Sequence, residues 1–139
     1  MLSMRLLVFI FKTFAMTKIL FDRLGGTRGI TAIVDDVVEA HMNNPAINAR
    51  FLPYKEQPEK LAVIKQHTID FFSAGSGGPV TYSGRDMPAT HEGMNINPTE
   101  YMQAVDDILK VLDKHQTDDE SKKDVLAILW SLKDMIIAK

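Results

Sequence analysis

The sequence contains no cysteine. Disulfides, thiolate zinc sites, iron–sulfur clusters and a cysteine nucleophile are therefore excluded, which leaves histidine nitrogen as the best metal ligand and methionine sulfur as a weaker one. The lack of cysteine suits a reducing compartment, and we expect the protein in the cytoplasm. An excess of positive charge is also missing, since 16 Lys and Arg stand against 18 Asp and Glu for a formal net charge of -2. This balance gives no support for a nucleic-acid partner, which needs a basic stripe or surface.

Long apolar runs are absent as well. The run at residues 6–11 is shorter than the roughly 20 residues of a transmembrane helix and the roughly 7–15 residues of a signal-peptide core, and Lys12 interrupts it. We interpret residues 1–16 as a flexible or pre-helical extension, or as the product of a start site annotated upstream of Met16; secretion or membrane contact is the less favoured alternative. Residues 17–139 have the size of one domain, and a content of 45% hydrophobic and 24% charged residues is typical of a globular protein.

Alternation of apolar and polar residues, the signature of strands, is also scarce, and helical spacing takes its place. Four segments have this spacing: 27–43, 58–74, 98–115 and 118–138. A shorter helix is expected at roughly 18–24 and a short helical piece near 87–93. Asn97 and Glu100 predict a capping box at the start of one long helix, and Thr117 and Glu120 predict a second box at the start of the next. The pattern predicts an all-α domain.

Motifs of common enzyme sites are missing too. The glycines at 25–29 match neither a dinucleotide fingerprint nor a Walker loop, and we interpret them as a tight turn between helices. His91-Glu92 begins like a zinc-protease motif, but position 95 is Asn where a second histidine is required. Three pairs of adjacent carboxylates occur: Asp35-Asp36, Asp106-Asp107 and Asp118-Asp119. We expect these to be solvated or capping groups, because neighbouring residues on a helix diverge by about 100°.

Four histidines remain as candidates for chemistry. His115 ends a helix, where a cation meets the negative end of the dipole, and we interpret it as a structural or surface residue. His41 lies on an inner helix face and is interpreted as a satisfied core or rim residue. His67 shares an apolar stripe with Phe71, and His91 lies in a short helical piece within a loop-rich region. An apolar helix face opposite a short helix with one imidazole is the arrangement that a haem needs. The pattern alone nevertheless favours a plain helical bundle with core histidines.

Three linked motifs alter that balance. They are Phe21-Asp22-Arg23-Leu24-Gly25-Gly26, then Phe71-Phe72 followed by Gly77-Gly78-Pro79, and finally residues 82–87 followed by 91–96. In this order and spacing, residues 17–138 resemble a group I truncated haemoglobin. The resemblance implies a two-over-two helical sandwich, in which the first two long helices cross the last two. It also implies haem b, iron protoporphyrin IX, as the cofactor.

The resemblance implies a role for each matched residue. His91 matches the proximal histidine that ligates the haem iron, Phe51 a phenylalanine that stacks on the porphyrin, and Tyr82 a tyrosine near a propionate. His67 matches a histidine that binds iron as a sixth ligand in some members; the alternative is that it points outward and touches a propionate. The other matched positions line the haem: Ile64, Thr68 and Phe72 on the distal side, and Met87 and Tyr101 in the apolar wall.

The sequence departs from the family on the distal side. Val38 stands where many members have a tyrosine that donates to bound oxygen, and Thr68 stands where many have a glutamine. A positioned donor stabilises the negative charge on bound oxygen by roughly 1–3 kcal/mol. We therefore expect faster oxygen release than in members with both donors.

The resemblance implies reversible binding of oxygen and other diatomic ligands at ferrous iron, with oxygen transport among the family's roles. Oxidation of nitric oxide to nitrate would require an external reductase, since no flavin or nicotinamide fingerprint is present. The alternative is a bis-histidyl electron-transfer or ligand-sensing haem protein, and a third reading is a haem-free interaction bundle. We expect a monomer or weak dimer.

Overall fold

A computed structural model describes residues 18–139, so the predicted extension at 1–16 lies outside the described residues. The regular structure within 18–139 is helical and confirms the all-α prediction. Its elements are α2 (Leu20–Arg23), α3 (Gly26–Asn43), η1 (Asn48–Arg50), η2 (Leu52–Glu56), α4 (Pro58–Gly75), α5 (Met87–His91), α6 (Pro98–Lys114) and α7 (Asp119–Ile136). None of these helices is both long and apolar enough to cross a membrane.

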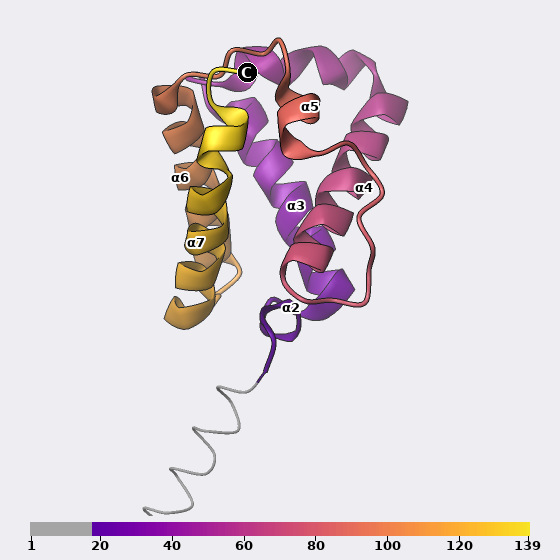
Figure 1. Ribbon diagram of the computed structural model, residues 1–139, viewed down its shortest axis with the longest axis vertical. Coiled ribbons are helices and arrows are strands. Elements are labelled where there is room, and N and C mark those ends of the chain that lie inside the picture. The colour runs from indigo at the N-terminus through magenta and orange to yellow at the C-terminus, as the bar shows by residue number, and fades with distance from the viewer. Residues whose placement is uncertain (1–17) are drawn as a thin grey trace, which may run out of the picture.

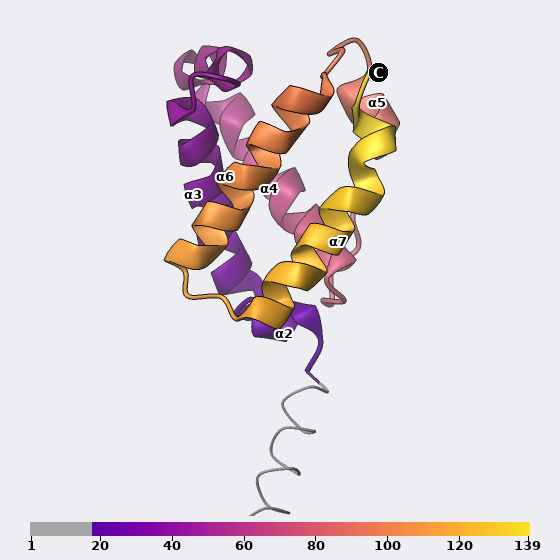
Figure 2. The same cartoon turned by 90° about the vertical axis from the view of Figure 1, so that its left-hand side faces the viewer.

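The four long helices form two crossing pairs. α3 packs against α4 on one side and α6 on the other, and α6 packs against α7. Figure 2 shows α6 and α7 in front, with α3 and α4 behind them. The short helix α5 lies at the carboxyl end of α7 (Figure 1) and contacts it. This arrangement confirms the predicted two-over-two sandwich.

The core draws buried side chains from α3, α6 and α7. α3 buries Ile30, Val34 and Val38 along one stripe at helical spacing, and Leu112 and Val125 come from the opposite pair. Each such side chain stabilises the fold by about 1.5–3 kcal/mol relative to exposure. These side chains fix the relative positions of three helices.

The helix ends show one confirmed cap and one corrected cap. The Asn97 side chain accepts a hydrogen bond from the backbone N–H of Glu100 at 2.8 Å, and Glu100 completes the predicted capping box. The box predicted from Thr117 and Glu120 is wrong, because Asp118 is the N-cap of α7 and accepts from the N–H of Ser121 at 3.1 Å. A carboxylate one residue later reaches the free N–H group instead.

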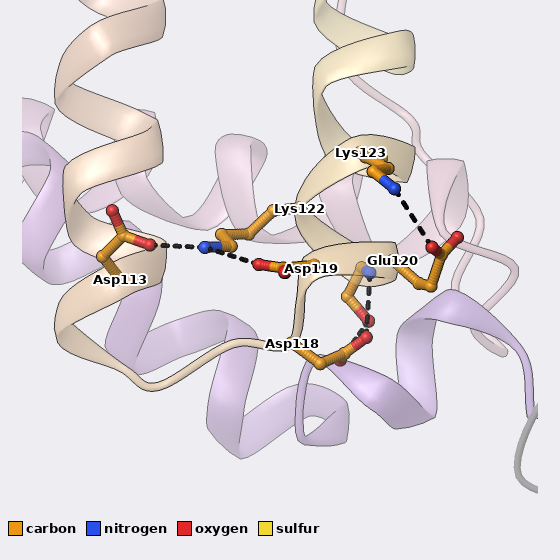
Figure 3. Close-up of polar contacts among 7 residues, drawn as sticks. Asp113, Asp118, Asp119, Glu120, Lys122 and Lys123 are labelled. Carbon is orange, nitrogen blue, oxygen red and sulfur yellow. Dashed lines mark hydrogen bonds and ion pairs between the residues drawn. The ribbon is translucent and has the colours of Figure 1, made fainter.

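The turn between α6 and α7 is covered by charged side chains (Figure 3). Lys122 bridges Asp113 at 2.7 Å and Asp119 at 3.1 Å, while Lys123 pairs with Glu120 at 3.2 Å. These groups lie close to water, where ion pairs are weak. We therefore assign them to the surface rather than to a site.

Two glycine requirements shape the first turn. Gly25 and Gly26 have φ angles of 92° and 64°, a left-handed conformation that glycine adopts without strain, which confirms the predicted tight turn. A Cβ on Gly29 would lie 2.1 Å from the carbonyl oxygen of Leu24, so α3 and α2 approach closely only with glycine there. The η1 and η2 turns were not predicted, because short 3₁₀ segments carry no apolar repeat.

Candidate functional site

α4 is packed along only part of its circumference. Its principal contacts are with α3 and η2, and only Ile69 and Ser73 are buried along its length. Ile64 is 37% exposed, while Phe71 and Phe72 are half-buried. Apolar side chains that lack full cover on a structural helix indicate a ligand or partner surface.

His91 occupies the last residue of α5. Asp86 is the N-cap of this helix, and its carboxylate accepts from the N–H of Ala89 at 2.8 Å. The Nδ1 atom of His91 lies 2.9 Å from the carbonyl oxygen of Met87. Because a carbonyl only accepts, Nδ1 carries the hydrogen, and in the neutral ring Nε2 then keeps its lone pair. Nε2 makes no hydrogen bond to any residue in the range 18–139. This is the orientation of a metal-binding imidazole held by an outer hydrogen bond.

Tyr82 lies in the loop between α4 and α5. Its hydroxyl donates to the carbonyl of Arg85 at 2.7 Å. Its ring meets Phe71 edge-on at 5.4 Å between centroids and His67 edge-on at 6.2 Å. A Cβ on Gly84 would lie 2.3 Å from the Tyr82 hydroxyl oxygen, so the loop folds onto the ring only with glycine there. The structure therefore brings Tyr82 and His67 together.

Phe51 lies between η1 and η2 and is half-buried. Its ring centroid is 5.0 Å from that of His41, with the planes tilted by 36°. Arg50, next to it, donates to the Glu100 carboxylate at 2.5 Å, and Glu100 belongs to the capping box of α6. Phe51 is thus positioned from α3 and from α6.

His41 and Asp107 form a buried pair below Phe51. His41 Nδ1 and Asp107 Oδ2 are 2.8 Å apart, and Asn44 donates to the same carboxylate at 3.1 Å. Burial lowers the pKa of His41, and the Asp107 carboxylate opposes that shift. His41 is thus the satisfied core histidine that was predicted. The prediction that Asp107 is a solvated or capping group is wrong, because its partners lie on α3 and in the segment after it.

The positions that the sequence predicted to be distal offer few hydrogen-bond donors. Thr68 is half-buried, and its hydroxyl donates to the carbonyl of Ile64 at 2.8 Å, within α4. Val38 is a core residue of α3. Tyr101 is also a core residue, and its hydroxyl donates to the carbonyl of Leu129 on α7. Burial raises the pKa of Tyr101 and keeps that hydroxyl protonated.

The predicted site residues thus fall into local groups. His67 and Tyr82 touch one another, Met87 holds His91, and Phe51 rests on His41. Asp107 was predicted only as a solvated or capping group and Gly84 only as part of the motif at 82–87, so neither was predicted as a site residue. Throughout residues 18–139, no group of three or more His, Asp or Glu side chains is arranged to hold a metal ion. A metal here would depend on one imidazole and on a group that brings its own ligands, as a porphyrin does.

Comparison with known proteins gives consistent answers. The sequence profile of bacterial-like globins matches residues 19–138. The Fe(III) form of truncated haemoglobin from Tetrahymena pyriformis is similar with a TM-score of 0.79 at 17% identity, covering 88% of this chain and 100% of that chain. The group II truncated haemoglobin from Bacillus anthracis gives a TM-score of 0.75 at 19% identity, covering 88% and 92%.

A third structure is the 2/2 haemoglobin from a Synechococcus species, in the cyanomet state and with covalently attached haem. It gives a TM-score of 0.73 at 21% identity, covering 84% of this chain and 94% of that chain. At these identities the structures show a shared fold, and the family is shown by the profile, which spans nearly all of the described residues. The chain belongs to the bacterial-like globin family.

Proposed function

We propose that this globin binds haem b through His91 and uses it to bind oxygen and other diatomic ligands reversibly. The supporting observation is the state of His91. Its Nδ1 is held by the Met87 carbonyl at 2.9 Å, so the ring is oriented and Nε2 has its lone pair for a metal. The residues fit the group, since a porphyrin also needs apolar walls such as the incompletely covered face of α4 provides.

The other residues have supporting roles in this proposal. Phe51 stacks on the porphyrin, Phe72 and Met87 contribute apolar contacts, and Tyr82 lies at the propionate edge. Haem, when bound, would supply a ferrous iron for a diatomic ligand. Oxidation of nitric oxide to nitrate would take its oxygen atoms from O2, and an external reductase would return the iron to the ferrous state. The protein's contribution is to orient one imidazole, exclude water with apolar side chains and set the number of distal donors.

The distal donors determine how long oxygen stays bound. Val38 has no donor, and the Thr68 hydroxyl is engaged with the Ile64 carbonyl. We predict that Thr68→Gln, which adds an amide donor, slows oxygen release by roughly 5- to 150-fold, the equivalent of one hydrogen bond to a charged group. Stopped-flow dissociation rates measure this. Val63→Gln, at an exposed position on the same helix, is the control, and equal rates in the two variants would contradict the prediction.

The test of haem binding is His91→Gly. We expect the wild-type chain to show a Soret band after reconstitution and the variant to lose its haem to an acceptor globin much faster. Added imidazole should restore the spectrum, because it replaces the missing ring. His115→Gly is the matched control, since His115 pairs with Asp36 away from α5. Normal haem retention in His91→Gly would refute the proximal assignment.

A second candidate is a bis-histidyl electron-transfer or sensing protein. The observation that favours it is the place of His67, exposed on the incompletely covered helix α4. A low-spin spectrum of the ligand-free ferrous protein would support this role, and a high-spin spectrum would support reversible oxygen binding.

The finer assignments belong to the same proposal. Membership of group I is supported by the Gly25-Gly26 turn and the Gly77-Gly78 motif. A cytoplasmic location is supported by the absence of cysteine. A monomer or weak dimer is testable by sedimentation of the haem-loaded chain.

A further inference from the structure

We propose that Tyr82 is a positioning residue that holds His67 at the edge of the haem site and so keeps the sixth coordination position of the iron free of protein. This inference rests on the proposed haem-binding function. It concerns the choice between the two candidate functions, which depends on where the His67 ring resides.

Tyr82 is itself held in place from three sides. Its hydroxyl is tied to the Arg85 carbonyl at 2.7 Å. The glycine at 84 lets the backbone pass close to the ring, since a Cβ there would meet the hydroxyl oxygen at 2.3 Å and ring carbons at 2.5 and 2.7 Å. The Phe71 ring meets it edge-on at 5.4 Å. Tyr82 is therefore a fixed surface against which a mobile side chain can rest.

His67 has little else to fix it. It lies one turn before Phe71 on α4, so both side chains project from the same face toward the loop. Its ring meets Tyr82 at 6.2 Å and 81°, the edge-to-face geometry that aromatic pairs prefer. His67 makes no hydrogen bond to the part of the chain that the structure describes. The contact with Tyr82 is thus the interaction that selects its rotamer.

The consequence is a competition between two positions of one ring. In this proposal the His67 ring either rests on Tyr82 or moves away from it to ligate an iron held by His91. A stronger contact with Tyr82 then lowers the population of the iron-bound position. An edge-to-face pair at an exposed site changes such a ratio by roughly two- to tenfold. Tyr82 therefore favours the five-coordinate state that reversible oxygen binding requires.

The experiment compares Tyr82→Ala with wild type, both loaded with haem. We expect the ratio of six- to five-coordinate ferrous haem to rise by roughly two- to tenfold in the variant, from absorption spectra and from the His67 phase of CO rebinding after flash photolysis. Tyr82→Phe keeps the ring and should change the ratio less. Thr81→Ala, an exposed neighbour in the same loop, should leave it unchanged.

A double variant separates this role from loosening of the loop. His67→Ala combined with Tyr82→Ala should be five-coordinate, because the new ligand is His67 itself. A six-coordinate double variant, or a Tyr82→Ala protein with the wild-type ratio, would overturn the inference while leaving haem binding intact.

A readout without haem tests the contact directly. Proton NMR of the haem-free chain should show ring protons of His67 shifted by the Tyr82 ring current, and the shift should disappear in Tyr82→Ala but persist in Thr81→Ala. Unchanged His67 resonances would also overturn the inference. A chain that shows the shift but takes up no haem would instead refute the proposed function, and with it the role assigned to Tyr82.

Discussion

Two histidine–aspartate pairs join α3 to α6, and the accessibility of water distinguishes them. In the first, His41 on α3 meets Asp107 on α6 at 2.8 Å, and the two side chains are 9% and 10% exposed. In the second, Asp36 on α3 meets His115 at the carboxyl end of α6 at 2.7 Å, and both side chains are about one quarter exposed, at 25% and 24%. Both pairs join a histidine to an aspartate between the same two helices. They differ in how far their side chains are exposed to water.

Burial changes what each pair does. Both aspartates line one open groove of about 260 Å³ between α3 and α6, but only Asp107 also reaches inward to His41 and Asn44. A buried pair pays a desolvation cost and is strongly destabilised when one partner is lost. A partly exposed pair loses little, because water replaces the missing partner. The buried pair therefore contributes to the packing of α3 on α6, and the partly exposed pair contributes little to stability.

The largest expected effect comes from Asp107→Ala. This change leaves a buried imidazole N–H without its acceptor, and the Asn44 amide keeps only Gln103 of its two acceptors. We therefore predict a loss of about 3 kcal/mol in the free energy of unfolding. Urea unfolding followed by circular dichroism measures it. Asp106→Ala, its exposed neighbour, should lie within about 0.5 kcal/mol of wild type. Equal losses in both variants would remove the distinction between buried and exposed carboxylates.

Acidification should affect the buried pair next. The pKa of His41 is lowered from its ordinary value of 6.5, chiefly by burial. Below that pH the unfolded chain takes up a proton that folded His41 resists, so folding stability falls as pH decreases toward the lowered pKa. One such group changes stability by at most about 1.4 kcal/mol per pH unit.

The measurement compares wild type with His41→Gln, which cannot titrate but keeps a donor for Asp107. Urea midpoints from about pH 7.5 to 5.5 should fall more steeply in wild type, and the other histidines cancel in the difference. Parallel pH profiles would mean that His41 carries no such proton linkage.

A third ion pair shows the effect of hydrogen-bond geometry at an unchanged degree of exposure. Arg50 and Glu100 are as exposed as the second pair, at 28% and 21%, but two nitrogens of Arg50 reach the carboxylate at 2.5 and 3.2 Å. Arg50 lowers the pKa of Glu100 below its ordinary value of 4.5, so this stabilisation is present above that pH and is lost as pH falls through the lowered value. We predict that Glu100→Ala costs about 1 kcal/mol, part of it from the lost capping box. Thermal unfolding at neutral pH tests this, with Glu92→Ala, an exposed site beside α5, as control.

The smallest effect should come from His115→Gln. Water reaches both partners, so the free energy of unfolding should change by less than about 0.5 kcal/mol. Hydrogen bonding to His115 lowers the pKa of Asp36 below 3.8, and the contribution of this pair therefore appears above that pH and disappears below it. A loss near that of Asp107→Ala, measured by the same urea unfolding, would show that burial does not separate the pairs.

The sequence predicted the long helices because apolar periodicity and capping residues are local signals. The predicted helix 98–115 is α6 at Pro98–Lys114, with its Asn97 cap confirmed. The predicted helix 118–138 ends earlier, at Ile136, since Ile137 leaves the helix to pair with Ile96. That pairing joins segments far apart in the chain and has no local signature.

The site was predictable only in part for the same reason. His91 could be proposed from its motif, and its hydrogen bond to Met87 lies within one turn of α5. Asp107 was misjudged because its partner, His41, lies 66 residues away. The contact between Tyr82 and His67 likewise depends on how a loop folds back onto α4. Whether a polar group is buried depends on residues far away in the sequence. The polar and apolar faces of a single helix carry no information about those residues.

The incomplete packing of α4 has a consequence for local unfolding. α4 packs mainly against α3 and the short η2 turn, whereas α3 packs against both α4 and α6. Local unfolding of α4 should therefore cost less free energy than local unfolding of α3. Its amide protons should therefore exchange with deuterium sooner than those of α3. A group bound against its open face would add its binding free energy to that opening. The rate of amide exchange along α4 would then report whether a group is bound to this face, without a spectrum of that group.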